Sequence, residues 1–256
     1  MEGSIVFKLS PSKYNTYTTC KLKYKFQYID KIEIKEEKNT SIEVGLLVHK
    51  VLENYREGLD VEELYEIYKN QYVLTDFDKS ILMMILENGV KKYKPFAGNR
   101  FLSEDYLQSQ LSDDLTIHGY IDRMYFAHED NLFEDENGSP KYKVVIVDYK
   151  SGRNKSDTSL QMKFYNALIW RNYNIKPEEM ISKVEYLRLD DTVTYTYDSD
   201  DINEFLMHLD TFAEIVNMTD RWNHRMTSLC KWCKYNKICE PYKSKQLLLE
   251  KSKRKR

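Results

Sequence analysis

The sequence lacks any long apolar run. Among its 256 residues, no segment approaches the length of apolar chain that a membrane-spanning helix needs. Residues 1–10 also lack the basic-then-apolar order of a secretory signal. Both absences argue against a membrane or secreted protein, and we expect a cytoplasmic one.

Linkers rich in Pro, Gly and Ser are absent too, and so are internal repeats. The length would suffice for one large domain or two small ones. Without a linker to separate two parts, one α/β domain is the better interpretation.

The chain as a whole lacks a large net charge of either sign, since its net charge is −2. Its charged residues are nevertheless unevenly distributed along the sequence. Residues 104–136 contain ten acids against one arginine, a net charge of −9. Residues 231–256 carry +8, from ten basic and two acidic residues, and residues 141–176 carry +6, from eight and two. Basic surface is thus available for phosphates, although each run also suits a solvated face and the basic C-terminal end suits a disordered tail.

Capping signals predict four helices in the first hundred residues. Ser10 and Pro11 are typical of a helix start, Asp60 with Glu63 forms a capping-box pattern, and Pro95 ends a helical pattern. The predicted helices are 11–28, 42–57, one opening at 60, and 77–94.

Strand patterns dominate the middle of the chain. The predicted strands are 101–111, 115–127 and 143–150, and a hairpin of 183–189 with 193–197. Helices are predicted at 158–173 and 199–222.

The strongest local signal is Asp148-Tyr149-Lys150, which follows the β-branched run Val144–Val147. That run predicts a buried strand, on which Asp148 and Lys150 project to the same side. A carboxylate can hold Mg²⁺ or Mn²⁺, and the lysine can stabilise the charge of a phosphoryl transition state. By itself the triplet also suits a simple ion pair.

Two further candidates for metal ligation are Asp122 and His49. Asp122 follows Gly119 on a predicted strand, where it is a possible second metal ligand or a partner for Arg123. His49 borders an apolar helical face, where a histidine is also common as a core residue. Glu104, which opens the preceding strand, is a weaker candidate.

Gln161 and Tyr165 are four residues apart on a predicted helix and so share one face. They are candidates for positioning a nucleotide, although ordinary packing explains them equally well.

Only four cysteines are present. Cys230, Cys233 and Cys239 are closely spaced, whereas Cys20 lies on the first predicted helix. Disulfides are uncommon in cytosolic chains, so metal ligation is favoured over four unrelated thiols. The spacing suits Zn²⁺ or an iron–sulfur cluster and does not choose between them.

Taken in order, these motifs resemble the RecB-type branch of the PD-(D/E)XK nuclease superfamily, in its iron–sulfur form. The resemblance spans nearly the whole chain. The matching motifs are Leu9-Ser10-Pro11-Ser12 with Cys20, Gly45–His49, Gly119–Arg123, Asp148–Gly152, Gln161 with Tyr165, and Cys230, Cys233 and Cys239.

The resemblance implies a restriction-endonuclease-like fold, a mixed sheet flanked by helices. It implies a single domain over 1–256, with a helical lobe at 1–98, a nuclease core at 99–222 and a cysteine-bearing end with a basic tail at 223–256.

The same resemblance implies roles for individual residues. His49, Asp122, Asp148 and the Tyr149 carbonyl would bind Mg²⁺ or Mn²⁺, with Lys150 as the catalytic lysine. Gln161 and Tyr165 would line the DNA path, and Cys20, Cys230, Cys233 and Cys239 would hold a structural [4Fe-4S] cluster.

The leading hypothesis is a metal-dependent exonuclease that cuts single-stranded DNA or duplex ends. The chain resembles both the CRISPR-associated RecB-like exonucleases and the RecB-like exonucleases of phages and plasmids. The alternatives are a DNA-end-binding subunit of a larger recombination, repair or CRISPR adaptation complex, and a zinc-stapled structural module.

Overall fold

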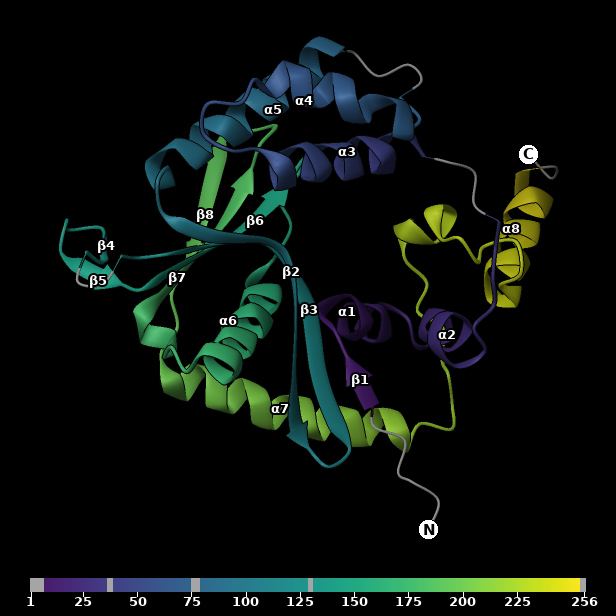
Figure 1. Ribbon diagram of the computed structural model, residues 1–256. Helices are drawn as coiled ribbons and strands as arrows, with labels where there is room; N and C mark the ends of the chain where they lie inside the picture. The colour runs from purple at the N-terminus through teal and green to yellow at the C-terminus, as the bar shows by residue number, and fades with distance from the viewer. Residues whose placement is uncertain (1–6, 36–38, 75–78, 129–130, 254–256) are drawn as a thin grey trace. The chain divides into compact units, whose positions relative to one another are not determined.

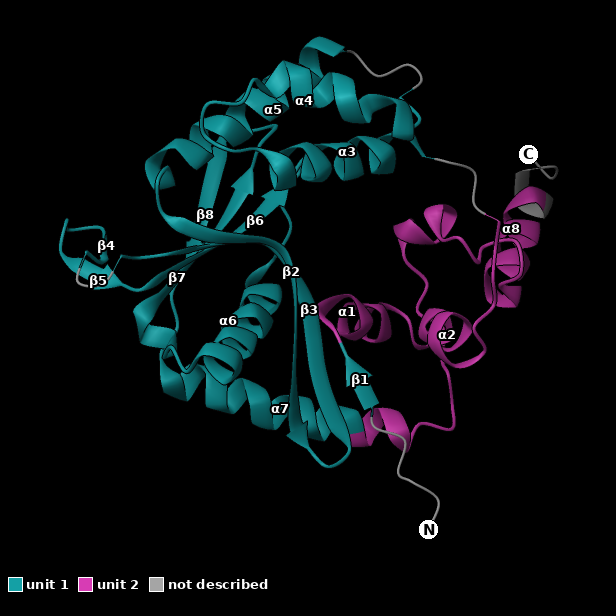
Figure 2. Ribbon diagram, in the orientation of Figure 1, with its two compact units in different colours: residues 1–9, 38–213 teal, residues 10–37, 214–256 magenta. Residues whose placement is uncertain are grey.

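The computed structural model describes residues 7–35, 39–74, 79–128 and 131–253. The chain forms two compact units (Figure 2). Unit 1 comprises residues 1–9 and 38–213, and unit 2 comprises residues 10–37 and 214–256. Both units therefore combine segments that are far apart in the sequence.

Unit 1 is built on a mixed six-stranded sheet (Figure 1). Five strands follow the order β1-β3-β6-β7-β8, and β2 pairs with β3 beside them. The β1–β3 and β6–β7 pairs are parallel, and the remaining pairs are antiparallel. The bounds are Phe7–Leu9 (β1), Arg100–Ser112 (β2), Leu115–Phe126 (β3), Val144–Lys150 (β6), Met180–Tyr186 (β7) and Asp191–Tyr195 (β8).

The central strand is β6, whose residues from Val144 to Tyr149 are all buried. A strand covered on both faces reads as a continuous apolar run, which explains the pattern in the sequence. Its polar residues stand at the carboxyl end, so this end of the sheet is the one that can carry chemistry.

Helices cover both faces of the sheet (Figure 1). On one face, α3 (Thr40–Asn54), α4 (Val61–Tyr68) and α5 (Lys79–Tyr93) share an apolar core with β3 and β6. On the other, α6 (Ser159–Tyr173) packs on β2 and β3. Phe164 of α6 contacts Phe205 of α7 (Ser199–Asn217), with ring centroids 5.1 Å apart. A small hairpin of β4 (Phe133–Glu134) and β5 (Pro140–Tyr142) extends from the sheet region.

Unit 2 contains short elements and an aromatic core. Its helices are α1 (Pro11–Thr19), α2 (Lys21–Tyr24) and α8 (Glu240–Lys253), together with a π-helical turn at Lys25–Ile29 and a 3₁₀ turn at Ser228–Trp232. The Tyr24 ring stacks on Trp222 with centroids 5.9 Å apart, and Tyr17 meets Tyr24 edge to face at 5.2 Å. Aromatic contacts of this kind take the place of the larger apolar core that unit 1 possesses.

The mixed sheet flanked by helices confirms the fold class predicted from the sequence. The single long helix predicted over 11–28 is wrong, because the backbone at Cys20 is extended and separates α1 from α2. The predicted hairpin is real, but its strands begin at Met180 and Asp191, a few residues earlier than the pattern indicated. Short β1, β4 and β5 escaped prediction, as did α8, which occupies part of the basic C-terminal run.

Among the described residues, no helix combines the length and the apolar character required to cross a membrane.

Candidate functional site

Two acids from adjacent strands meet at the polar end of the sheet. In the antiparallel pairing of β3 with β6, Arg123 is opposite Val147, which brings Asp122 and Asp148 to the same region. The Tyr149 backbone N–H donates a hydrogen bond of 2.6 Å to Asp122 Oδ2. Asp148 is almost completely buried. The sheet itself thus positions both carboxylates.

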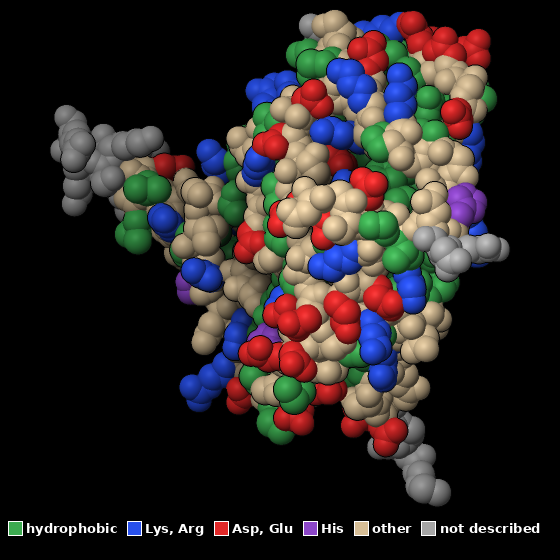
Figure 3. Space-filling view, turned by 90° about the vertical axis from the view of Figure 1, so that its left-hand side faces the viewer, with side chains coloured by type: hydrophobic (Ala, Val, Ile, Leu, Met, Phe, Trp, Pro, Cys, Tyr) green, Lys and Arg blue, Asp and Glu red, His purple; other side chains and the backbone are tan. Residues whose placement is uncertain are grey.

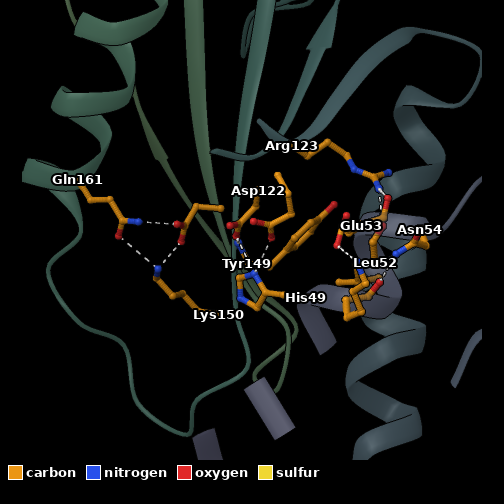
Figure 4. A network of polar contacts seen from close by, with 12 residues as sticks. His49, Leu52, Glu53, Asn54, Asp122, Arg123, Tyr149, Lys150 and Gln161 are labelled. Atoms are coloured by element: carbon orange, nitrogen blue, oxygen red, sulfur yellow. Dashed lines mark hydrogen bonds and ion pairs between the residues drawn. The ribbon is translucent and has the colours of Figure 1, made fainter. Parts of the chain in front are cut away.

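His49 and Glu104 complete a group of potential metal donors with Asp122. His49 Nδ1, projecting from α3, lies 3.4 Å from Asp122 Oδ2 (Figure 4). The same nitrogen lies 3.6 Å from Glu104 Oε1. One donor atom from each of these three residues lies within 4.8 Å of the other two. One imidazole and two carboxylates form a donor set that suits Mg²⁺ or Mn²⁺.

Glu104 reaches this site through an unusual backbone conformation. In the register of β2 with β3, Ser103 pairs with Arg123 and Asp105 with Ile121, so Glu104 faces Asp122. Its φ of 49° lies in the left-handed region, which residues other than glycine rarely adopt. Such strain is concentrated at functional sites, where surrounding structure enforces it. Glu104, only a weak candidate from the sequence, is therefore a full member of the donor group.

The crowding of charged groups shifts their pKa values. Burial, and then the negative charge of Asp122, raise the pKa of Asp148 to about 6. Burial acts to lower the pKa of His49, but Asp122 and Glu104 outweigh it and raise that pKa well above its ordinary value. For Asp122, burial acts to raise the pKa, and the His49 charge lowers it overall. The metal-free site thus holds His49 as a cation that compensates the acids.

Lys150 and Gln161 form a second polar cluster around Asp148 (Figure 4). Lys150 Nζ lies 2.6 Å from Asp148 Oδ2 and donates to Gln161 Oε1 at 3.2 Å. Gln161 Nε2 donates to Asp148 Oδ1 at 2.8 Å and to the Tyr165 hydroxyl at 2.6 Å. The Gln161 amide therefore accepts a hydrogen bond from Lys150 and donates one to Asp148, and these two bonds hold the Lys150 and Asp148 side chains in place.

Arg123 anchors the helix that carries His49. Its guanidinium is fully buried and donates to the backbone carbonyls of Leu52 and Glu53, near the C-terminal end of α3. The same group lies over the rings of Tyr93 and Phe101, 5.2 and 4.5 Å from their centroids. A cation at a helix C-terminus also complements the helix dipole. The residue after Asp122 thus ties β3 to α3, rather than forming the ion pair with Asp122 considered from the sequence.

The structure brings most of the sequence candidates into this site. His49, Asp122, Asp148, Lys150, Gln161 and Tyr165 are linked by the contacts above. The described contact of the Tyr149 backbone is through its N–H, and its role as a carbonyl ligand stays a prediction. Glu104 is only a weak candidate from the sequence, because its place in the site depends on the strand register, which the sequence does not display.

The four cysteines line one cavity within unit 2. This cavity has a volume of about 200 Å³, and Cys20, Cys230, Cys233 and Cys239 all contribute to its wall. Burial chiefly raises the pKa of Cys239, and the charges of the other three thiols add to the effect. The cysteine that is distant in sequence therefore lies near the other three.

Comparison with known proteins gives one match of broad coverage. The family model described as "PD-(D/E)XK nuclease superfamily" matches residues 8–240. No curated protein matches significantly.

Two solved structures show weak likeness. The crystal structure of SSO0001 is 12% identical, with a TM-score of 0.43, over 94% of this chain and 88% of that one. Rai1 of Scheffersomyces stipitis is 10% identical, with a TM-score of 0.21, over 84% and 71%. Both TM-scores are below 0.5, so neither likeness bears on function.

Proposed function

The chain belongs to the PD-(D/E)XK nuclease superfamily, which implies a metal-dependent nuclease, and we propose that it is specifically a DNA exonuclease. Its substrates are single-stranded DNA or duplex ends, and its metal is Mg²⁺ or Mn²⁺.

The observation that carries the proposal is the convergence of His49, Glu104 and Asp122 beside the pair Asp148 and Lys150. A divalent ion held by such donors polarises a phosphoryl oxygen and lowers the pKa of bound water. The imidazole donor makes Mn²⁺ as suitable as Mg²⁺. Asp148 is well placed to join the ligands, because its carboxylate sits next to Asp122 in the sheet.

Lys150 supplies the cation for the reacting phosphate. Its side chain is 30% exposed, whereas its partner Asp148 is 2% exposed, so the ammonium can reach a substrate from the buried site. Burial acts to lower the pKa of Lys150, but Asp148 raises it, which keeps the ammonium charged. A fixed positive charge stabilises the extra negative charge of the transition state.

For unit 2 we propose a [4Fe-4S] cluster bound by the four cysteines. The support is a single cavity that all four thiols line, with room for more than one metal ion. A lone Zn²⁺ draws its four sulfurs to about 2.3 Å from one centre and needs no such space. The cluster would act as a structural staple.

The nuclease proposal is tested with Lys150→Ala on end-labelled DNA in the presence of Mn²⁺. Loss of this charge is expected to slow cutting by about a hundredfold or more, because one transition-state contact typically contributes that much. Lys155→Ala is the matched control, since Lys155 pairs with Asp191 at the surface. Cutting by Lys150→Ala at the parent rate would rule the mechanism out. Release of single nucleotides from an end, rather than internal fragments, identifies the exonuclease.

The cluster proposal is tested by anaerobic purification and a visible spectrum. An iron–sulfur protein is brown and contains iron and acid-labile sulfide in equal amounts. A colourless protein that contains zinc instead would contradict the cluster.

One observation also favours a second function, as the DNA-end-binding or processing subunit of a larger recombination, repair or CRISPR adaptation complex. The helix α8 exposes Leu247, Leu248 and Leu249 in succession, by 58%, 67% and 46%. Exposed apolar side chains grouped on one helix suit a contact with another protein. Gel filtration with candidate partners tests this function, and full activity of an isolated monomer would speak against it.

A further inference from the structure

Two exposed tyrosines form a pair on the β2–β3 hairpin, next to the candidate metal centre. Tyr106 and Tyr120 are register partners, and their ring centroids are 5.0 Å apart. The two residues are 41% and 59% exposed. The His118 ring lies 5.8 Å from Tyr106 and extends the cluster. The hairpin therefore presents flat aromatic surface to solvent.

The tyrosines share a face of the hairpin with the metal donors. Tyr120 is two residues from Asp122, and residues two apart on a strand project to the same side. Tyr106 pairs directly with Tyr120 and so shares that side. The opposite face is covered by α6, because Gly119 packs against Tyr165 and Leu168. Two strand residues span about 7 Å. A nucleic-acid strand bound at the metal centre thus passes close to both rings.

Charge near the rings selects which part of a nucleic acid can bind there. Glu104 and Asp122, the acids that neighbour the rings, offer no positive charge to a phosphate until a metal ion is bound. On the face seen in Figure 3, acidic and basic side chains lie side by side. Aromatic rings, in contrast, attract bases of any sequence by stacking. Only unpaired nucleotides can offer a base to them, because duplex bases are already stacked on one another.

We propose that Tyr106 and Tyr120 stack the bases of an unpaired strand whose phosphodiester bond lies at the metal centre. This inference rests on the proposed nuclease function and deepens it by naming the residues that hold the unpaired nucleotides of a single strand or of an overhang at a duplex end. The Tyr106 hydroxyl donates to Gln108 Oε1 at 3.3 Å, which holds that ring in position.

Binding is measured first, in the full-length chain carrying Lys150→Ala so that the oligonucleotide stays intact. Adding Tyr106→Ala and Tyr120→Ala is expected to weaken binding of a labelled single-stranded oligonucleotide at least about fivefold. Binding of a blunt duplex should change less than twofold. Tyr106→Phe with Tyr120→Phe keeps both rings and should keep the affinity. Ile67→Ala, a change at an exposed residue of α4, is the control.

Either of two results overturns the stacking proposal. One is an unchanged affinity for the single strand after removal of both rings, with folding verified by thermal melting. The other is an equal loss for single strand and blunt duplex.

Cutting is measured separately, with Lys150 intact. The two alanine substitutions should slow hydrolysis of the oligonucleotide but leave hydrolysis of an abasic strand of the same length unchanged, because that strand has phosphodiesters but no base to stack. Equal slowing on both substrates contradicts stacking. If the parent protein hydrolyses neither substrate, the nuclease function fails, whereas the binding measurement still decides the role of the tyrosines.

Discussion

The two units hold their candidate sites by different physical means. In unit 1 the acids, His49 and Lys150 stand on a sheet and helices with a large apolar core, so the site needs no ligand to keep its shape. In unit 2 the thiols stand on short turns around a few aromatic rings. A small unit with little core usually depends on a metal or disulfide staple. The difference predicts which changes damage the fold and which damage only the chemistry.

Loss of one thiol should have the largest effect on stability. Cys20→Ala is expected to release the cluster and destabilise unit 2 by several kcal/mol, because binding free energy at such sites is folding free energy. Limited proteolysis should then cut residues 10–37 and 214–253 while the sheet of unit 1 stays resistant. Thr19→Ala, beside the same cavity, is a control without a thiol. Unchanged melting and proteolysis would refute the staple.

Removal of a carboxylate from unit 1 should weaken metal binding while leaving the stability of the fold nearly unchanged. Glu104→Gln is expected to weaken Mn²⁺ binding by about ten- to a hundredfold, the range seen when groups around a metal are replaced. The melting temperature of the metal-free protein should change little, because the loss of repulsion from Asp122 offsets the loss of attraction to His49. Asp105→Asn is the matched control, since Asp105 contacts Tyr173 of α6 instead. Equal loss of Mn²⁺ affinity in both variants, measured by calorimetry, would remove Glu104 from the site.

Arg123 anchors α3 to β3, and its replacement tests whether this anchor is needed to hold His49 in the site. Arg123→Met keeps apolar bulk but deprives the Leu52 carbonyl of its donor, which should cost about 1–3 kcal/mol of unfolding free energy. Because α3 carries His49, Mn²⁺ affinity should fall as well. Arg171→Met, at an exposed position of α6, is the control. A loss of stability with unchanged Mn²⁺ affinity would show that α3 is positioned without Arg123.

A change of pH should alter the Mn²⁺ affinity of the site in unit 1 by a smaller factor than the substitutions do. Metal binding requires His49 neutral and Asp148 ionised. The pKa of Asp148 is raised to about 6 and that of His49 is raised well above 6.5, so both groups bind protons in the metal-free protein near pH 6. Raising the pH removes these protons, and Mn²⁺ affinity should increase about tenfold or more from pH 6 to pH 8. An affinity that stays constant or falls over this range, in calorimetric titrations, would contradict the charge assignment.

Much of unit 1 could be predicted from the sequence, because its signals are local. The continuous apolar run of β6, the capping of α4 by Asp60 and the alternation in β3 all act over a few residues. Where prediction failed, long-range pairing was decisive. Strand β1 has three residues and exists because it pairs with β3, more than a hundred residues away. The break at Cys20 likewise interrupts a segment whose local pattern is helical.

The sequence by itself determined the residue types of both sites and their order along the chain, since carboxylates, imidazole and thiols carry their chemistry with them. Only the tertiary structure decided which of them meet. Glu104 joins His49 through strand register and a left-handed backbone, Cys20 reaches the cavity of the other cysteines, and Tyr106 lies against Tyr120. Each of these contacts joins separate elements, and such proximity depends on the packing of the whole unit rather than on any local pattern.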